Sequence, residues 1–399
     1  MRSRAATLAL AALVTFPALA GRAEQSAQPA AAQKRDEVTP EQLRSAIDTL
    51  GAFDFPVRMA AARTVRRAAP SAAVPALIAA VASHQDEYVR FRALVLLSAF
   101  NDARARDVML QAFKDRNDRL RAVAYAWFEH NPDPAVLPRL LAALEKEESD
   151  LVRPALTRAL SAYGQDAKVR AVLSGLVMKG QDLFRAAVIE ALGDRKAAYA
   201  LDPIVQVAKL DGPLQDDAVL AIGKVGDKRG LETLAGLQRS APRPLQPTLA
   251  AAICLIGSNC ASHRAYLQET VAFALGNPGF QELLRAAASG LSALAVAGDG
   301  PAAESLIDRG ATARDPERAA LALALGTVAL RNTRLLLGVL DARTDAGPAV
   351  ELLREAFDML EEDFEEERFF ALVRRTYWAA APGSASRRIA EMLIQRLEF

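Results

Sequence analysis

The chain has 399 residues, of which 51% are hydrophobic and only 6% are aromatic. Its 49 basic and 48 acidic residues nearly cancel, which argues against a protein that binds nucleic acid through a basic surface. Alanine and leucine dominate and strand-forming residues do not alternate at length, so the composition predicts an all-α fold.

Residues 1–20 have the features of a signal peptide. Arg2 and Arg4 form a charged start, residues 5–16 are apolar, and Ala18-Leu19-Ala20 is a typical cleavage site. The apolar run is short for a membrane span, and no later segment is long and apolar enough to be one. We therefore predict an exported protein, periplasmic or secreted, whose mature chain begins at Gly21. An uncleaved anchor is the alternative.

Residues 21–38 are rich in alanine and glutamine and have no periodicity, which predicts a disordered linker. Order is expected to begin with Thr39, Pro40 and Gln42. Threonine suits a helix N-cap, proline suits the first helical position, and glutamine three residues after the cap completes a capping box. The predicted helix runs to about Leu50 and ends at Gly51, where it covers the first repeat.

A period of about 32 residues organises the stretch from residue 54 to residue 212. Relative to a recurring arginine, apolar residues at offsets −1, +3 and +7 form one helical face, and those at +19, +20 and +23 form another. Turn-forming residues such as Pro70 and Gly164 separate the two helices. The pattern predicts stacked antiparallel helix pairs, that is, an α-solenoid. The recurring arginines are Arg58, Arg90, Arg121, Arg153 and Arg185.

An aspartate precedes each predicted first helix at the same period, where it suits a helix N-cap. An arginine about one turn later can bond an aspartate or a carbonyl of the neighbouring repeat with its forked donors. We interpret the two rows as a structural ladder between repeats; an arginine row that binds phosphate or carboxylate ligands is the alternative. The aspartates are Asp54, Asp86, Asp118, Asp150 and Asp182.

Several strings resemble HEAT repeats, specifically the HEAT-like repeat first described in phycobilisome lyases. They are Asp-Glu-Tyr-Val-Arg at 86–90, Asp-Leu-Val-Arg at 150–153, Asp-Leu-Phe-Arg at 182–185, and the helix junction at 221–231. The resemblance covers roughly residues 40–345 and implies a superhelix of stacked helix pairs. It implies little about activity, because solenoids host many functions.

The repeats are expected to continue, less regularly, to residue 347. Repeat seven holds Cys254 and Cys260, the only two cysteines. Paired cysteines in an exported protein tend to be joined. In an unbroken helix, residues six apart lie about 9 Å apart along the axis, too far for a disulfide. We therefore predict a disulfide with a helix end near Gly257; two unlinked thiols are the alternative.

Residues 348–399 hold many of the aromatic residues and an acidic run at 361–367. Terminal repeats need a polar outer face, so we predict an acidic, aromatic helical cap. Because charge runs are usually solvated, a ligand-binding acidic patch is the less favoured reading.

No motif predicts catalysis, a cofactor or a metal. His84, His130 and His263 fall in different repeats, without a second histidine or a cysteine at ligand spacing. The pair Glu129-His130 occurs once, and we interpret it as a helix end rather than as a metal site. The expectation is a protein without enzymatic activity.

The function predicted from these observations is an exported scaffold that binds an unidentified protein or peptide on its concave surface. We expect the second helices of the repeats to form that surface. Two alternatives stay open: a lyase- or isomerase-like enzyme on the same fold, and a structural component of a cell-envelope complex. The predicted face contains Gln111, Asp115, Arg139, Lys146, Ser174 and Gln206.

Overall fold

The computed structural model describes residues 38–360 and 362–399. These residues form 22 α-helices and three short 3-10 turns, and no strand occurs among them. The predicted all-α solenoid is therefore confirmed. The predicted signal peptide at 1–20 and residues 21–37 of the predicted linker lie outside the described part.

Nine helix pairs follow the starting helix α1 (Pro40–Thr49). The first helices of the pairs are α2 (Phe55–Arg67), α4 (Glu87–Ser98), α6 (Asp118–His130), α8 (Val152–Ser161), α10 (Asp182–Asp194), α12 (Gln215–Val225), α14 (Gln246–Leu255), α16 (Gln281–Val296) and α18 (Glu317–Arg331). The second helices are α3 (Pro70–Ser83), α5 (Ala105–Ala112), α7 (Leu137–Leu144), α9 (Ala167–Leu176), α11 (Leu201–Ala208), α13 (Gly230–Ser240), α15 (Cys260–Gly276), α17 (Gly300–Thr312) and α19 (Thr333–Ala342). Three further helices end the chain: α20 (Gly347–Met359), α21 (Asp363–Ala379) and α22 (Ala385–Arg396).

Helix α1 begins with the predicted capping box. The Thr39 hydroxyl accepts a hydrogen bond from the Gln42 N–H at 3.2 Å, and the Gln42 side chain accepts one from the Thr39 N–H at 2.9 Å. Pro40 occupies the first helical position, where its missing N–H costs nothing. Leu43 and Ile47 are buried, so this helix covers the apolar end of the first pair.

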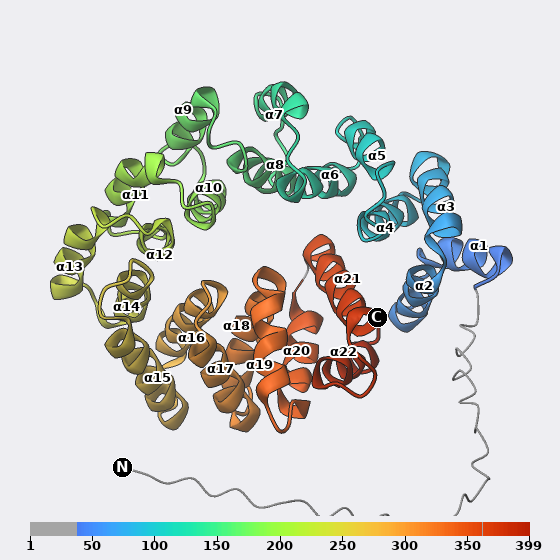
Figure 1. The fold of residues 1–399 in the computed structure, drawn as a ribbon. Coiled ribbons are helices and arrows are strands. Elements are labelled where there is room, and N and C mark those ends of the chain that lie inside the picture. The colour runs from blue at the N-terminus through green and yellow to red at the C-terminus, as the bar shows by residue number, and fades with distance from the viewer. Residues whose placement is uncertain (1–37, 361) are drawn as a thin grey trace, which may run out of the picture. The chain divides into compact units, whose positions relative to one another are not determined.

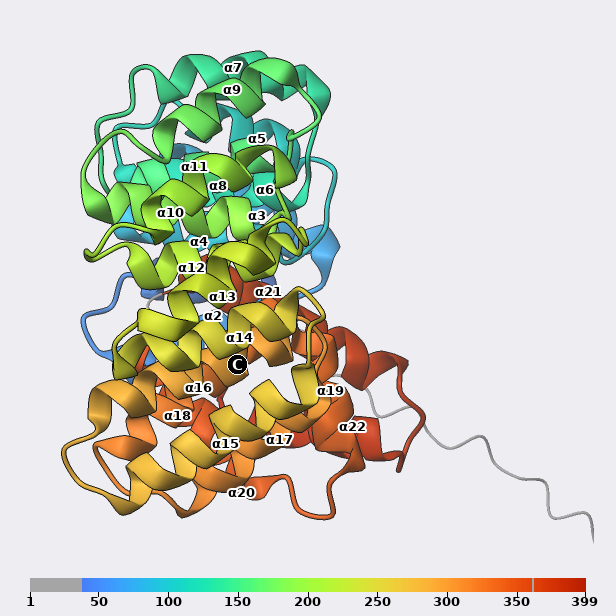
Figure 2. The same ribbon diagram turned by 90° about the vertical axis from the view of Figure 1, so that its left-hand side faces the viewer.

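The first helices of the pairs line the concave side of residues 38–399, and the second helices lie on the outside (Figure 1). Figure 2 views the array from its outer side, with the second helices α13 and α15 toward the viewer. The prediction that the second helices form the concave surface is therefore wrong. The sequence pattern marks which faces are buried, but it does not reveal which row of helices is the shorter, inner one.

Small residues explain why the first helices form the inner row. A Cβ added to Gly223 of α12 would lie 2.4 Å from the Cα of Ala252 in α14. A Cβ added to Gly326 of α18 would lie 2.7 Å from the Cβ of Ala356 in α20. Helix α12 thus approaches α14, and α18 approaches α20, more closely than a side chain at either glycine would allow. Closely spaced helices form the inner row of a curved array.

The two cysteines are joined by a disulfide, with Cα atoms 4.1 Å apart. Helix α14 ends at Leu255, and Gly257 and Asn259 then adopt positive φ angles of 92° and 45°. The chain therefore reverses between the cysteines, as such a short bridge requires.

The C-terminal helices do more than cover the last pair. Helix α21 also lies beside the N-terminal helix α4 (Figure 1), and side chains of α21 reach α2, α4 and α6. The expectation that the acidic run is a solvated face is wrong for Glu365 and Glu367, which are buried. Each has hydrogen-bond partners where it is buried: Arg66 and Arg374 bond Glu367, and His130 and Arg368 bond Glu365.

We predict that Gly223→Ala destabilises the protein. The added methyl group must displace the α14 backbone near Ala252, and such overpacking costs about 1–3 kcal/mol. Gly338→Ala in α19 is the matched control, since no atom lies within 4 Å of its added Cβ. The control should be neutral or stabilising, by about 0.5–1 kcal/mol. Urea unfolding of both variants measures the difference, and equal effects at the two glycines would contradict the close-packing argument.

Candidate functional site

Among the described residues, three ion pairs and one histidine–carboxylate contact join the C-terminal segment to the first three repeats, and we call this contact the closure seam. Three basic side chains come from α2 and α4, and the histidine ends α6. The pairs are Arg63–Glu398 at 3.0 Å, Arg66–Glu367 at 2.6 Å, His130–Glu365 at 2.9 Å, and Arg92–Asp363. The seam therefore ties together parts of the chain that are remote in sequence.

The pair of Arg66 and Glu367 lies at the centre of the seam. Their side chains are only 3% and 1% exposed. Arg66 donates through Nε and Nη2 to both carboxylate oxygens, and Arg374 adds a bond to Glu367 at 3.3 Å. The Arg66 guanidinium also lies 5.1 Å from the centre of the Phe370 ring. Loss of one partner would leave a buried charge unpaired, which typically costs about 3–5 kcal/mol.

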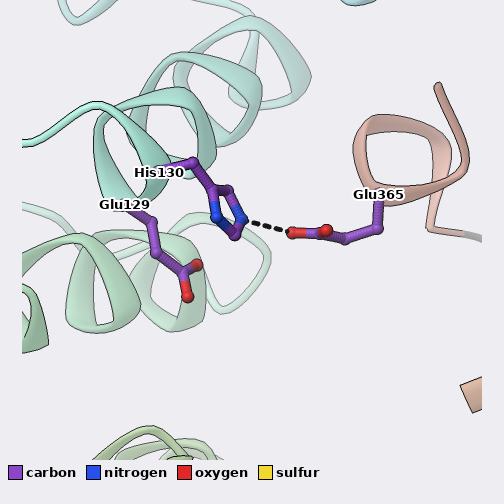
Figure 3. A group of neighbouring side chains, drawn as sticks. All are labelled: Glu129, His130 and Glu365. Carbon is purple, nitrogen blue, oxygen red and sulfur yellow. Dashed lines mark hydrogen bonds and ion pairs between the residues drawn. The ribbon is translucent and has the colours of Figure 1, made fainter. Parts of the chain in front are cut away.

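Glu129, His130 and Glu365 form a second cluster at the seam, shown in Figure 3. Glu129 and His130 end helix α6, and Glu365 reaches across from α21. One ligand atom of each residue lies within 4.8 Å of the others, which is a geometry that a metal ion could use. His130 Nε2 lies 2.9 Å from Glu365 Oε1, and the imidazole ring stacks beside Phe364.

The charges around this cluster favour an ion-pair network over a cation site. Arg158 and Arg195 donate to the Glu129 carboxylate at 3.3 and 3.2 Å. Glu365 is paired with Arg368 and His130, and Arg331 lies 3.7 Å away. Burial alone would raise the pKa of Glu365, but His130, Arg368 and Arg331 lower it to about 2. A divalent cation would have to displace arginines that already neutralise both carboxylates.

The network continues along the concave side. Arg158 of α8 also pairs with Asp194 of α10 at 3.0 Å, and Lys224 of α12 pairs with Asp194 at 2.8 Å. Burial raises the pKa of Asp194, but Lys224 and Arg158 outweigh it, so the pKa is lowered. The charged groups of four successive first helices therefore mostly satisfy one another.

A cavity of about 440 Å³ lies between α21 and the ends of α4, α6 and α18. That volume falls within the usual range of small-molecule pockets, about 300–1,000 Å³. Its described lining includes four arginines, one histidine and three asparagines, and it includes no carboxylate. The polar lining residues are Ser98, Asn101, His130, Asn131, Arg331, Asn332, Thr333, Arg334, Arg368 and Arg375.

A second hollow, of about 600 Å³, lies between α1 and α3. The methyl groups of Ala72, Ala76 and Ala79 form part of its lining. His84 and Asp48, which also line it, lie 3.4 Å apart and face each other. Its other polar lining residues are Arg44, Ser83 and Gln85.

The recurring arginines lie at the junctions between repeats. Arg90 donates to the Val81 carbonyl and to Asp115, and Arg121 donates to the Asp115 carbonyl and to Glu147. Each therefore bonds the carbonyl end of the preceding second helix and a carboxylate at the following junction. Arg58 bonds the carbonyls of residues 52 and 53, and Arg185 bonds the carbonyl of residue 177. The Arg153 guanidinium stacks 3.7 Å from the centre of the Phe184 ring.

The predicted aspartate row is less regular than the arginine row. Asp54 and Asp86 cap their helices, but Asn117 and Gln181 occupy the cap positions of α6 and α10. Asp118 and Asp182 are the first residues of those helices and pair with the arginines of their own repeats, at 2.7 and 3.0 Å. Asp150 is exposed in the turn before α8. The prediction that all five aspartates are N-caps is therefore wrong for Asp118, Asp150 and Asp182, because each of these helices begins one position away from the expected register.

The predicted binding-face residues lie on or just after the second helices, on the outer side. Asp115 is already engaged by Arg90, and Ser174 is partly buried. The exposed ones are Gln111, Arg139, Lys146 and Gln206. The closure seam was not predicted. The acidic run at 361–367 is visible in the sequence, but nothing in the sequence shows which basic residues pair with it.

Comparison with known proteins supports the repeat assignment. A family model for HEAT repeats matches residues 41–127 and 109–193. The chain therefore contains HEAT-like repeats, while the likeness to the phycobilisome-lyase type rests on the sequence strings alone. No curated protein matches the chain.

Two solved structures are similar to this chain. The Escherichia coli protein YibA is 18% identical with a TM-score of 0.40, over 55% of this chain and 82% of that one. A chain in the structure of Kap95p with RanGDP is 14% identical with a TM-score of 0.36. That match covers 90% of this chain and 54% of the other, so this chain spans about half of its length.

Among the described residues, no single helix has the length and apolar character to cross a membrane. Helices α18 and α19 meet those criteria only when taken together, and they are bent by 114° at the break between them.

We predict a pH-dependent stability that originates at Glu366 of α21. Burial, followed by the nearby Asp363, raises the pKa of this carboxyl from 4.5 to about 8. Because the folded state holds this proton more tightly than the unfolded state, its contribution to stability is complete below pH 4.5 and is lost as pH rises toward about 8. Glu366→Gln should therefore melt at a higher temperature than the wild type at about pH 8.5, and the difference should shrink on acidification.

Glu365→Gln is the matched control on the same helix, because its pKa is shifted in the opposite direction. That variant should melt below the wild type at neutral pH. Its deficit should shrink as pH falls through 4.5 toward about 2. A Glu366→Gln melting difference that stays constant from pH 5 to about 8.5 would contradict the assignment.

Proposed function

We propose that this chain is an exported scaffold that binds another protein or peptide along one edge of its helix array. The HEAT-like solenoid supports the general class, since such folds present extended rigid surfaces. Exposed apolar side chains at the repeat junctions support the particular location. We call this set the apolar edge; it comprises Phe53, Phe55, Leu151, Met178, Leu183 and Leu210.

The exposed residues recur at matching places in the repeats. Leu151 and Leu183 each stand two positions before a recurring arginine, and their exposures are 57% and 75%. Phe53 and Phe55 precede the first arginine of the row and are fully and 58% exposed. A single exposed leucine needs no explanation, but Leu151 and Leu183 share one register in neighbouring repeats and offer apolar area that a partner could cover.

The concave side is the weaker candidate for this role. Its charged side chains, from Glu129 through Arg158 to Asp194 and Lys224, pair with one another. A partner there would have to break existing ion pairs, whereas at the apolar edge it would remove exposed apolar surface from water. A protein or an extended peptide therefore gains more free energy by binding at the apolar edge than on the concave side.

Substitution at the apolar edge tests the proposal. We predict that Leu151→Glu combined with Leu183→Glu abolishes capture of partners from envelope extract and leaves the melting temperature nearly unchanged, since both side chains are exposed. Surface substitutions of this kind change stability by about 0.5 kcal/mol or less. The matched control, Arg139→Glu with Gln206→Glu on second helices, should retain the captured proteins. Equal capture by both double variants would refute the edge as the binding surface.

Export is the second component of the proposal. The signal-like pattern in residues 1–20 and the use of only two, closely spaced cysteines support it. We predict that intact-mass measurement of protein expressed in a bacterium finds a chain beginning at Gly21 outside the cytoplasm. A soluble cytoplasmic product that retains Met1 would contradict the export route without affecting the apolar edge.

A further inference from the structure

We propose that the cavity between α21 and the ends of α4, α6 and α18 binds a small organic anion, one with a phosphate monoester or polycarboxylate group. This site is separate from the apolar edge and goes beyond the proposed protein binding. Three observations support it: the basic side chains of the lining, the two lining arginines that pair with no described residue, and the aromatic side chains of the walls.

The charged side chains that line the cavity are all basic. Four arginines line it, and no described lining residue is a carboxylate. Elsewhere on the inner side basic and acidic groups alternate and pair, as Arg158 does with Glu129 and Asp194. A cleft lined by one sign of charge concentrates ions of the other sign. The arginines are Arg331, Arg334, Arg368 and Arg375.

Two of the four arginines pair with a carboxylate, and the other two pair with no described residue. Arg331 donates to Glu362 at 2.8 Å, and Arg368 donates to Glu365, so a carboxylate already neutralises each of these two arginines. Arg334 and Arg375 are exposed and make no ion pair with any described residue. A guanidinium presents a planar fork of donors that fits phosphate or carboxylate oxygens in a bidentate way. Two such forks in one cavity match a doubly charged ligand.

The remaining walls favour an organic ligand over a bare inorganic ion. Trp127, Phe364 and Phe369 contribute aromatic surface to the lining. Asn101, whose side chain bonds no described residue, adds an amide that can donate and accept. The volume of about 440 Å³ exceeds what one phosphate or sulfate would fill. A ring or chain attached to the anionic group would occupy the rest.

The cavity exists only when the closure seam is formed. Its walls come from α4 and α6 in the N-terminal half, from the junction of α18 and α19, and from α21. A ligand there would contact both sides of the seam and would therefore bind the closed array in preference to an opened one. Ligand binding should raise the melting temperature by the usual linkage.

Titration of the full chain with defined anions tests the proposal. The probes are AMP, citrate and neutral adenosine, each at constant ionic strength, with calorimetry for affinity and thermal melting for stability. We expect AMP or citrate to bind and to raise the melting temperature above a sodium chloride control, and adenosine not to bind. Binding of AMP alone identifies a phosphate site, and binding of citrate alone identifies a carboxylate site.

Variants locate the binding. Arg334→Gln and Arg375→Gln should each weaken the binding probe at least about tenfold, because a hydrogen bond to a charged group contributes roughly 1.5–3 kcal/mol. Both side chains are exposed, so the variants should fold and melt like the wild type without ligand. Arg139→Gln, an exposed arginine on α7, should stay within about twofold. The proposal is overturned if neither anion exceeds the salt control, if adenosine binds as well as AMP, or if the Arg334 and Arg375 variants bind like the wild type.

Discussion

The buried ion pair between Arg66 and Glu367 is the contact on which the closed arrangement of residues 38–399 depends. With side chains 3% and 1% exposed, neither charge could be removed from water without the other. The partners stand 301 positions apart in the chain. In an open solenoid each repeat contacts only its neighbours, and stability is nearly a sum of local terms. The pair adds a non-local term, so the first repeats and the C-terminal helices support each other.

The pair can form only because the array curves enough to bring its ends together. That curvature follows from small residues along the first helices, where glycines such as Gly223 and Gly326 let neighbouring backbones approach. Small residues let neighbouring helices of the inner row lie close together, and this close spacing curves the array. The curvature in turn brings α21 into contact with α2. The anion cavity is a further consequence, because its walls come from both sides of that meeting.

Most of the described charged groups pair with other groups of the chain, and only a few remain available to a ligand. Most of those on the concave side neutralise one another across repeats, as Glu129, Arg158 and Asp194 do. The recurring arginines serve the junctions between repeats, where Arg90 and Arg121 bond helix ends and carboxylates. What is left for recognition among the described residues is the apolar edge together with Arg334 and Arg375, which pair with no described residue. A large protein partner and a small anion would thus use different surfaces of the same scaffold.

The sequence by itself determined the helical class, the repeat period, the capping box at Thr39 and the need for a helix end between Cys254 and Cys260. These follow from local rules, because helical periodicity, capping and chain geometry act over a few residues. Tertiary structure alone decided which helix row is concave, because that depends on how closely Gly223 meets Ala252 across two helices. It also decided the partners of the acidic run, which in sequence resembles a solvated face. No local rule relates Glu367 to Arg66, since their proximity is set by the accumulated curvature of all the repeats between them.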